Sequence, residues 1–232
     1  MRLITWNVNG RTKRLEDQLR AIRFRRADLV ALQEITPTTL ARWGEGLADI
    51  GLPHVIDSFA LRTDRYRQKG KHRRLGQIIA ARWPIRPLDP TDIEIPWTEK
   101  VLSGITRSPW GPIEIHNAHI PPGASHGWIK VETFEGICAR LGRRSRRHRI
   151  LCGDFNSPQN ELSDGRTVMW GERRNARGVI VPASWDPDGE WAAGERGVIC
   201  GLGRFDLRDV YRSLYGYRKQ GYSWRLIRTK GS

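Results

Sequence analysis

The sequence predicts an α/β fold in which two packed β-sheets are flanked by helices. Short apolar runs typical of buried strands recur along the chain, and segments with apolar residues at helical spacing lie between them. Strands interspersed with helices indicate sheets covered by helical layers. The chain has 232 residues, enough for a sizeable core, and we expect a single domain over residues 1–232.

The first half of the chain alternates predicted strands and helices. Residues 2–7 and 29–33 are predicted strands, and Leu15, Leu19 and Ile22 lie at the spacing of one apolar face on a helix between them. The next predicted elements are a helix from Thr38 to Ile50, strands over 54–59 and 77–82, and a basic loop over 61–75.

The second half begins with a predicted hairpin. Its strands cover 101–107 and 113–118, and Ser108-Pro109-Trp110-Gly111 forms the turn. Residues 157–203 hold many glycines and charges with little periodicity, which predicts a long excursion on the side of the functional site rather than a linker. The other predicted elements are a helix over 128–141 closed by Gly142, a strand over 149–153, a helix over 205–214 and a last strand over 222–227.

Three of the predicted strands stop on acids or amides. Asn7 ends the first and Asn9 follows it, Glu34 directly follows the second, and Asp154 and Asn156 follow the strand over 149–153. Because alternate side chains on a strand share a face, Asp154 and Asn156 leave the strand on the same side. Open sheets bind ligands at such strand ends, and oxygen ligands of this kind suit Mg²⁺ or Mn²⁺. The alternative is that these polar residues only cap strands.

Four short segments in a fixed order carry a family signature. They are Trp6-Asn7-Val8-Asn9-Gly10, Leu32-Gln33-Glu34, Asn117-Ala118-His119-Ile120-Pro121-Pro122-Gly123 and Gly153-Asp154-Phe155-Asn156. With a weaker match at Tyr222-Ser223-Trp224, the chain resembles the endonuclease/exonuclease/phosphatase superfamily over most of residues 1–227, and most of all its exonuclease III and AP-endonuclease branch. The resemblance implies a four-layer α/β sandwich of the deoxyribonuclease I type.

The resemblance also implies a role for each matching polar residue. Glu34 would be the principal Mg²⁺ ligand, and Asn7 would lie beside the metal and hydrogen-bond the catalytic carboxylate. Asp154 would orient and deprotonate the attacking water, and Asn156 would donate to a phosphate oxygen. His119 stands where AP endonucleases usually carry a tyrosine and deoxyribonuclease I-like members a histidine, and it would protonate the leaving oxygen or hold the phosphate. We expect His116, shortly before it in the sequence, to share its face.

The net charge of +15, from 40 Lys and Arg against 25 Asp and Glu, predicts a polyanionic partner, and we expect nucleic acid, DNA in the first place. The excess lies in four basic clusters, over residues 20–26, 69–74, 140–149 and 225–230. The candidate nucleic-acid contacts are Asn9, Arg73 and Arg74, together with Lys130 and Trp224, whose places in the family's pattern imply a phosphate contact and an aromatic wall of the nucleoside pocket.

The chain departs from the family pattern in one respect. Members normally continue past the Ser-Trp strand to a final Ser-Asp-His motif, and no Ser-Asp-His occurs in this sequence. We therefore expect a C-terminally incomplete sandwich, a site completed by a partner subunit or a missing segment, or catalysis that differs or is lost.

The leading hypothesis is a Mg²⁺-dependent nuclease that hydrolyses nucleic acid by metal-assisted attack of water on phosphate. The alternative is a nucleic-acid-binding protein of the same fold with lost or partner-dependent catalysis. A phosphatase of small phosphates is a third hypothesis, which the basic clusters disfavour. DNA against RNA, endonuclease against exonuclease and abasic-site specificity stay open.

Composition indicates the compartment. Cys138, Cys152 and Cys200 show no metal-ligand spacing, and their odd number suits reduced thiols in a cytoplasm. The start of the chain lacks the apolar stretch of a signal peptide, and no apolar run is long enough to cross a membrane. We therefore expect a cytoplasmic protein without a membrane partner.

Overall fold

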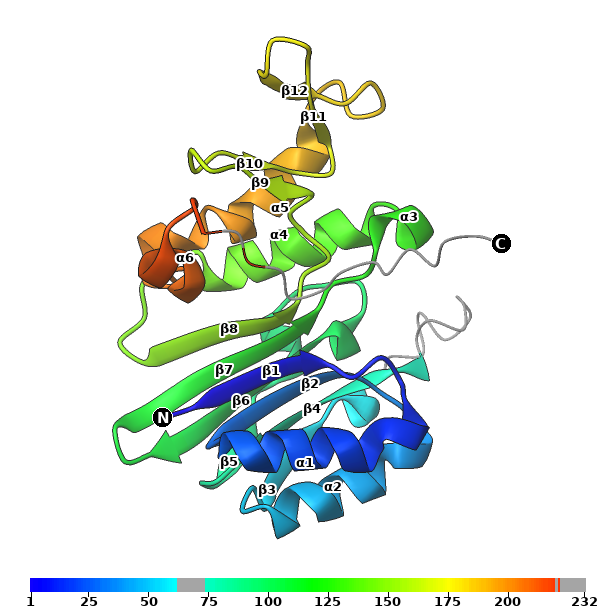
Figure 1. Ribbon diagram of the computed structural model, residues 1–232, viewed down its shortest axis with the longest axis vertical. Helices are drawn as coiled ribbons and strands as arrows, with labels where there is room; N and C mark the ends of the chain where they lie inside the picture. Colours follow the sequence, from blue (N-terminus) through cyan, green and yellow to red (C-terminus); the bar gives the residue numbers. More distant parts are fainter. Residues whose placement is uncertain (62–73, 220, 222–232) are drawn as a thin grey trace.

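Two mixed β-sheets pack face to face with helices on both outer faces in the computed structural model, which describes residues 1–61, 74–219 and 221 (Figure 1). The α/β sandwich predicted from the sequence is confirmed. Two predicted segments, the basic loop and the strand over 222–227, lie wholly or mostly outside the described residues.

The first sheet has the strand order β1-β2-β4-β3. These strands are β1 (Leu3–Asn7), β2 (Leu29–Ile35), β4 (Gly76–Ala81) and β3 (His54–Asp57), and only β1 and β2 run parallel. Helices α1 (Leu15–Arg25) and α2 (Leu40–Asp49) cover its outer face. The predicted apolar face of α1 is confirmed, since Leu15, Leu19 and Ile22 are buried there.

The second sheet has the order β5-β6-β7-β8. Its strands are β5 (Ile85–Pro87), β6 (Val101–Ser108), β7 (Gly111–His119) and β8 (His148–Asp154). Strands β6 and β7 form the predicted hairpin, whereas β7 and β8 run parallel. Helix α4 (Ile129–Leu141) covers the outer face through buried Phe134 and Ile137 and ends at Gly142, as predicted.

The interface between the sheets is apolar except at one end. Its buried residues are Leu29, Ala31, Ile79, Ala81, Leu102, Ile115 and Cys152. Near the carboxyl ends of the strands, Asn117 of β7 donates to the carbonyl oxygens of Leu32 (3.0 Å) and Ile78 (3.2 Å) and accepts from Gln33 Nε2 at 2.6 Å. Buried amides cost free energy unless they are hydrogen-bonded, so this contact joins the two sheets in one relative position.

The glycine-rich excursion, residues 157–203, contains regular structure that the sequence did not predict. Strands β9 (Asn160–Glu161) and β10 (Thr167–Val168) form one small ribbon, and β11 (Glu172–Arg174) and β12 (Ile180–Pro182) form another. Helix α5 (Glu190–Ile199) packs on α4, beside the short α3 (Gly123–His126) (Figure 1). Gly194 permits that packing, because a Cβ there would lie 2.6 Å from Val131 Cγ1.

The helix predicted over 205–214 is shorter than expected. A 3₁₀ turn covers Leu202–Phe205, and α6 begins only at Val210 and ends at Tyr215. The Asp209 side chain accepts a hydrogen bond from the Arg212 backbone amide.

No helix within the described ranges combines the length and the apolar character needed to cross a bilayer. The three cysteines carry free thiols, and burial raises the pKa of Cys152 to about 12, which makes that thiol unreactive.

Candidate active site

Four polar side chains meet where β1, β2, β7 and β8 end, namely Asn7, Glu34, His119 and Asp154. On β7 and β8, Ile115 and Cys152 face the gap between the sheets. His119 and Asp154 follow them at even spacing, so they face the same way at the ends of their strands. The site therefore forms at the carboxyl edge of the sheet–sheet interface.

Glu34 reaches this site through a β-bulge. The pairing of β2 with β4 shifts between Gln33 and Ile35, and Glu34 has a φ of +62°. Leu32 and Ile35 both pack on the helix side of the sheet although they are three residues apart. The extra residue of the bulge therefore turns Glu34 away from the helices. A left-handed non-glycine residue costs about 1–3 kcal/mol, and such strain is concentrated at functional sites.

Asp154 leaves β8 after a position that only glycine can occupy. Gly153 has a φ of +137°, and a Cβ there would lie 1.8 Å from the carbonyl oxygen of Ala118. After Asp154, the Asn156 amide donates back to Asp154 Oδ1 at 3.1 Å, and Asn156 Nδ2 donates to the Ile120 carbonyl at 2.9 Å. The close approach of β8 to β7 thus places the carboxylate beside the segment that follows His119.

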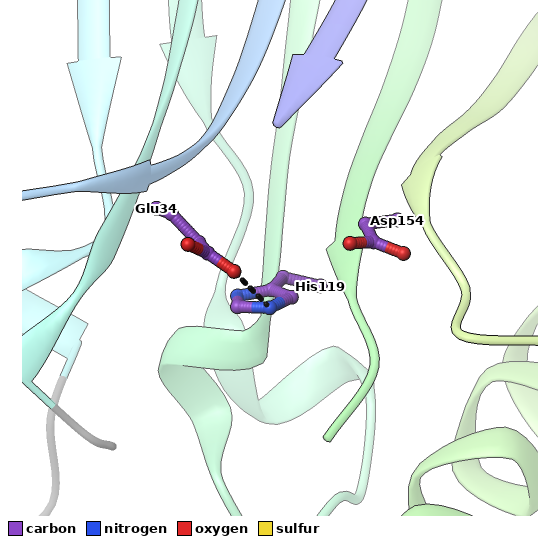
Figure 2. A group of neighbouring side chains, drawn as sticks. All are labelled: Glu34, His119 and Asp154. Carbon is purple, nitrogen blue, oxygen red and sulfur yellow. Dashed lines mark ion pairs between the residues drawn. The ribbon is translucent and has the colours of Figure 1, made fainter. Parts of the chain in front are cut away.

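Asn7 connects the two carboxylates. Its Nδ2 donates to Glu34 Oε1 at 2.9 Å and to Asp154 Oδ2 at 2.7 Å, and its Oδ1 accepts from the Asn9 amide at 2.9 Å. The predicted hydrogen bond from Asn7 to Asp154 is present. Glu34, His119 and Asp154 each offer one ligand atom, and these atoms lie within 4.8 Å of one another (Figure 2). The side chains of Glu34 and Asp154, which end different strands, therefore converge on one site.

The donor set fits a divalent cation. Two carboxylates held this close repel each other, and Asn7 between them is neutral, so a cation would be stabilised there. Two carboxylates and one imidazole leave room for water ligands, which Mg²⁺ and Mn²⁺ commonly retain in proteins.

His119 is neutral in this environment. Burial, followed by the nearby charges of Lys100 and His126, lowers its pKa to about 3. Lys100 Nζ lies 3.4 Å from Nδ1, and Glu34 Oε1 lies 3.5 Å from Nε2 (Figure 2). Proton donation by a charged imidazolium does not suit this environment, whereas a hydrogen bond from a neutral ring to phosphate, or a bond to a metal, does.

His116 does not share the face of His119, so that expectation was wrong. The two histidines are three residues apart on β7, and alternation places them on opposite faces. His116 lies on the α4 side, where its ring nitrogens contact Ser103 Oγ at 2.8 Å and Glu114 Oε1 at 3.0 Å.

Lys130 is not available as a surface phosphate contact, which corrects the sequence prediction. Its side chain is 2% exposed, and Nζ pairs with Glu195 Oε1 at 2.5 Å and donates to the Asn156 carbonyl at 3.0 Å. Helix α5, which the sequence analysis missed, supplies the partner carboxylate. Burial lowers the pKa of Lys130, and the hydrogen bond to Glu195 acts in the opposite direction.

The basic cluster over residues 140–149 is partly structural. The side chain of Arg149 is 1% exposed and donates to Asp206 and to the carbonyl oxygens of Leu141 and Phe205. Arg147 pairs with Glu114 at 3.4 Å. These guanidinium groups compensate buried or fixed acceptors, so the cluster offers less free charge to a polyanion than its sequence indicates.

The remaining predicted contacts have different outcomes. Asn9 and Arg74 are exposed. The Asn9 amide holds Asn7, and Leu75, next to Arg74, approaches the position of Gly10, where a Cβ would lie 3.5 Å from its Cδ2. Both therefore lie close to the edge that carries Glu34, and their contact with nucleic acid stays a prediction. Arg73 and Trp224 lie outside the described residues.

Several residues that support the site from behind were not predicted from the sequence. Gln33 and Asn117 belong to the motifs, but their role as a buried clamp between the sheets was not predicted. A signal existed for Gln33, an uncharged amide directly after the apolar run 29–32, whereas Asn117 stands among polar residues. Glu195 and Trp170 had no comparable local signal, because their partners lie on other elements.

The comparisons with known proteins agree with this geometry. A model described as the Endonuclease/Exonuclease/phosphatase family matches residues 4–226. The chain belongs to this family. It shares the family's α/β sandwich of the deoxyribonuclease I type. No curated protein matches the chain.

Three solved structures show the same fold. An AP endonuclease from Archaeoglobus fulgidus matches at a TM-score of 0.50 and 20% identity, over 70% of this chain and 60% of its own. A sphingomyelinase C from Streptomyces griseocarneus matches at 0.52 and 16%, over 68% and 65%. A humanized D. rerio TDP2 matches at 0.50 and 15%, over 74% and 72%. The chain thus spans less than two thirds of the first two proteins, and all three likenesses concern the fold alone.

Proposed function

We propose that this protein is a Mg²⁺- or Mn²⁺-dependent phosphodiesterase that hydrolyses nucleic acid, with DNA as the first candidate substrate. The observation that carries the proposal is the convergence of Glu34 and Asp154 on the Asn7 amide at one edge of the sandwich. A structural role alone would not require two carboxylates, with strained backbone at Glu34, at the same strand ends.

Asp154 is the candidate general base. Its Oδ2 accepts from Asn7 and its Oδ1 from the Asn156 amide, so both oxygens are held in a set orientation. A carboxylate held in this way can orient a water molecule toward a phosphorus atom and take its proton. A positioned general base typically contributes about 10²–10⁴-fold to the rate.

Glu34, with Asp154 and His119, would hold the cation. A bound divalent ion supplies charge stabilisation to phosphate oxygens and lowers the pKa of a bound water. Asn7 keeps the two carboxylates at their separation through both of its N–H groups.

Asn156 and His119 are the candidate phosphate-holding groups. Asn156 Nδ2 uses one N–H for the Ile120 carbonyl, which leaves the second for a non-bridging phosphate oxygen. His119, as the alternative to binding the cation, can donate one further hydrogen bond from its neutral ring. These donors would meet the charge that develops on the phosphate during attack.

Charge supports nucleic acid as the substrate. Because an AP endonuclease and a sphingomyelinase share this fold, the architecture does not select a substrate. The net charge of +15 favours an extended polyanion over a compact phosphate.

A substrate panel tests the proposal. Purified protein is given abasic duplex, plain duplex, single-stranded DNA and RNA, each with Mg²⁺, with Mn²⁺ and with EDTA, and gel shifts are recorded on the same preparation. We expect metal-dependent cleavage of at least one DNA, lost with EDTA and strongly reduced in Glu34→Gln. The logarithm of the affinity for duplex DNA should fall steeply with the logarithm of salt, by about 0.9 per neutralised phosphate.

Two outcomes would contradict the proposal. Gel shifts without metal-dependent product on any substrate would indicate a nucleic-acid-binding protein without turnover. A flat salt response together with hydrolysis of a small phosphodiester would indicate a small-substrate enzyme.

A further inference from the structure

We propose that Lys130, Glu195 and Trp170 are positioning residues that hold the backbone of the Asp154–Asn156 loop in its reactive geometry. The proposal rests on the function proposed above. It gives the excursion, residues 157–203, a role in catalysis although none of its side chains contacts the cluster of Glu34, His119 and Asp154 in the described hydrogen bonds and ion pairs.

The Lys130–Glu195 pair is fully removed from solvent. Lys130 lies on α4 with 2% of its side chain exposed, and Glu195 lies on α5 with 0% exposed. A buried ion pair is weak evidence for stability, because well-packed apolar residues of similar volume often serve as well. The role of the pair is therefore inferred from the groups that it contacts, rather than from its burial alone.

The carboxylate of Glu195 accepts hydrogen bonds from both the Asp154–Asn156 loop region and the excursion. Besides Lys130, its carboxylate accepts from Ser157 Oγ at 2.8 Å, from the Trp170 amide at 2.8 Å and from Trp191 Nε1 at 3.1 Å. Ser157 directly follows Asn156, so the carboxylate joins the end of the loop to α5. Trp170 is held by the same carboxylate through its backbone.

The Asn156 carbonyl oxygen accepts hydrogen bonds from two members of this network. Lys130 Nζ donates to it at 3.0 Å and Trp170 Nε1 at 2.9 Å. Asn156 has a φ of +48°, a left-handed conformation that persists in a non-glycine residue only when its surroundings determine it strongly. The hydrogen bonds from Lys130 and Trp170 to the Asn156 carbonyl hold the residue in this conformation.

The orientation of Asn156 in turn sets the reactive groups. Its amide donates to Asp154 Oδ1, and its side chain donates to the Ile120 carbonyl. A continuous path of hydrogen bonds therefore leads from Glu195 through Lys130 and Trp170 to Asn156 and then to the candidate base. If the carbonyl lost its donors, the peptide could rotate and Asp154 would lose the amide that orients one of its oxygens. Misplacement by about 1 Å can reduce a rate about 10²-fold.

Paired phenylalanine variants test this path. Trp170→Phe keeps an aromatic side chain but removes the indole N–H that reaches Asn156, together with the volume of the second ring. Trp185→Phe makes the same change at an exposed tryptophan whose ring packs on Trp191 at a centroid distance of 5.2 Å. We expect kcat to fall about tenfold in Trp170→Phe, with KM changed less than about twofold, and both constants to stay near wild type in Trp185→Phe.

A double variant tests the ion pair. Lys130→Met with Glu195→Leu replaces both charges by apolar side chains of similar volume, so neither is left buried and unpaired. We expect kcat to fall about 10²-fold with KM changed less than about threefold.

Hydrogen–deuterium exchange supplies a readout that needs no substrate. Peptides that cover residues 153–158 should exchange faster in Trp170→Phe and in the double variant than in wild type, whereas peptides from α1 and β2 should not change. If wild-type protein hydrolyses nothing, the proposed function fails, and the exchange data still decide this inference.

Two results would overturn the inference. One is wild-type exchange over 153–158 in both variants, whatever their activity. The other is faster exchange spread evenly over the molecule, since a merely structural role predicts general loosening. If the double variant does not fold, Trp170→Phe decides alone.

Discussion

Strand β7 carries two histidines that the fold uses differently. His116 faces α4, where Ser103, Glu114 and the ring form a hydrogen-bonded row, with all three side chains buried. His119 faces the gap between the sheets, at the strand end, beside Glu34. Serine, histidine and glutamate in contact suggest nucleophilic catalysis by their types alone, yet this row lies under a helix. Position on the strand, rather than residue type, separates the structural histidine from the candidate functional one.

The comparison extends to the charges around each histidine. Glu114 accepts from His116 and is approached by Arg140 at 3.6 Å and Arg147 at 3.4 Å, so its charge is compensated inside the protein. Near His119, the carboxylates of Glu34 and Asp154 share the neutral amide of Asn7, and Lys100 Nζ lies 3.4 Å from the ring. The closed cluster around Glu114 serves stability, whereas two neighbouring carboxylates at an edge are suited to bind a cation.

The largest expected effect is on catalysis at the strand-end cluster. Asp154→Asn removes the candidate base and keeps the shape of the side chain, so the hydrolysis rate should fall by at least about 10²-fold. The melting temperature should stay within about 2 °C of wild type, because the residue is not part of the core. Rates at saturating substrate and thermal denaturation check this. Wild-type cleavage by a purified variant would remove Asp154 from the proposed mechanism.

The second effect separates the two histidines directly. His116→Gln disturbs a buried network around Glu114, and we expect a loss of about 2–3 kcal/mol in the free energy of unfolding. Its activity per folded molecule should stay near wild type. His119→Gln should show the reverse, with about tenfold or greater loss of rate and little change in stability. Urea denaturation and kinetics on both variants test this, and the same pattern in both would refute the distinction.

A third test uses acid. The hydrogen bond from His116, with Arg140 and Arg147 nearby, lowers the pKa of Glu114 from an ordinary 4.5 to about 2. Because the folded pKa is depressed, the contribution of this group to stability is complete above about pH 4.5 and is lost as the pH falls toward about 2. Urea midpoints between about pH 6 and pH 3 should decline less steeply in Glu114→Gln than in wild type. Equal slopes would show that Glu114 is not perturbed.

The smallest expected effect concerns the exposed edge near the site. Arg74→Ala removes one cation that the structure leaves on the surface. The slope of log affinity against log salt for duplex DNA should become shallower by about 0.9, the value for one phosphate contact. Arg147→Ala is the matched control, since that guanidinium pairs with Glu114. A larger change of slope in the control would reverse the assignment of the two arginines.

Local patterns predicted most of the sandwich. The apolar runs of β1, β2, β4 and the β6–β7 hairpin, and the helical spacing in α1 and α4, were sufficient because each element buries one face that its own residues define. Helix α5 escaped detection because Gly194 and Gly197 resemble helix breakers, whereas here both lie against α4, near Val131 and Cys138. The boundaries of α6 were wrong because the true cap, Asp209, lies inside the predicted helix.

The order of residues along the chain was enough to determine that carboxylates and amides stand at the ends of buried strands, since alternation and apolar runs are properties of neighbouring residues. Only the tertiary structure decided which of them meet. The bulge that turns Glu34, the opposite faces of His116 and His119, and the burial of Lys130 against Glu195 each depend on a partner far away in sequence. Such contacts arise when sheets and helices pack, because burial and hydrogen bonding then act between segments that share no local pattern.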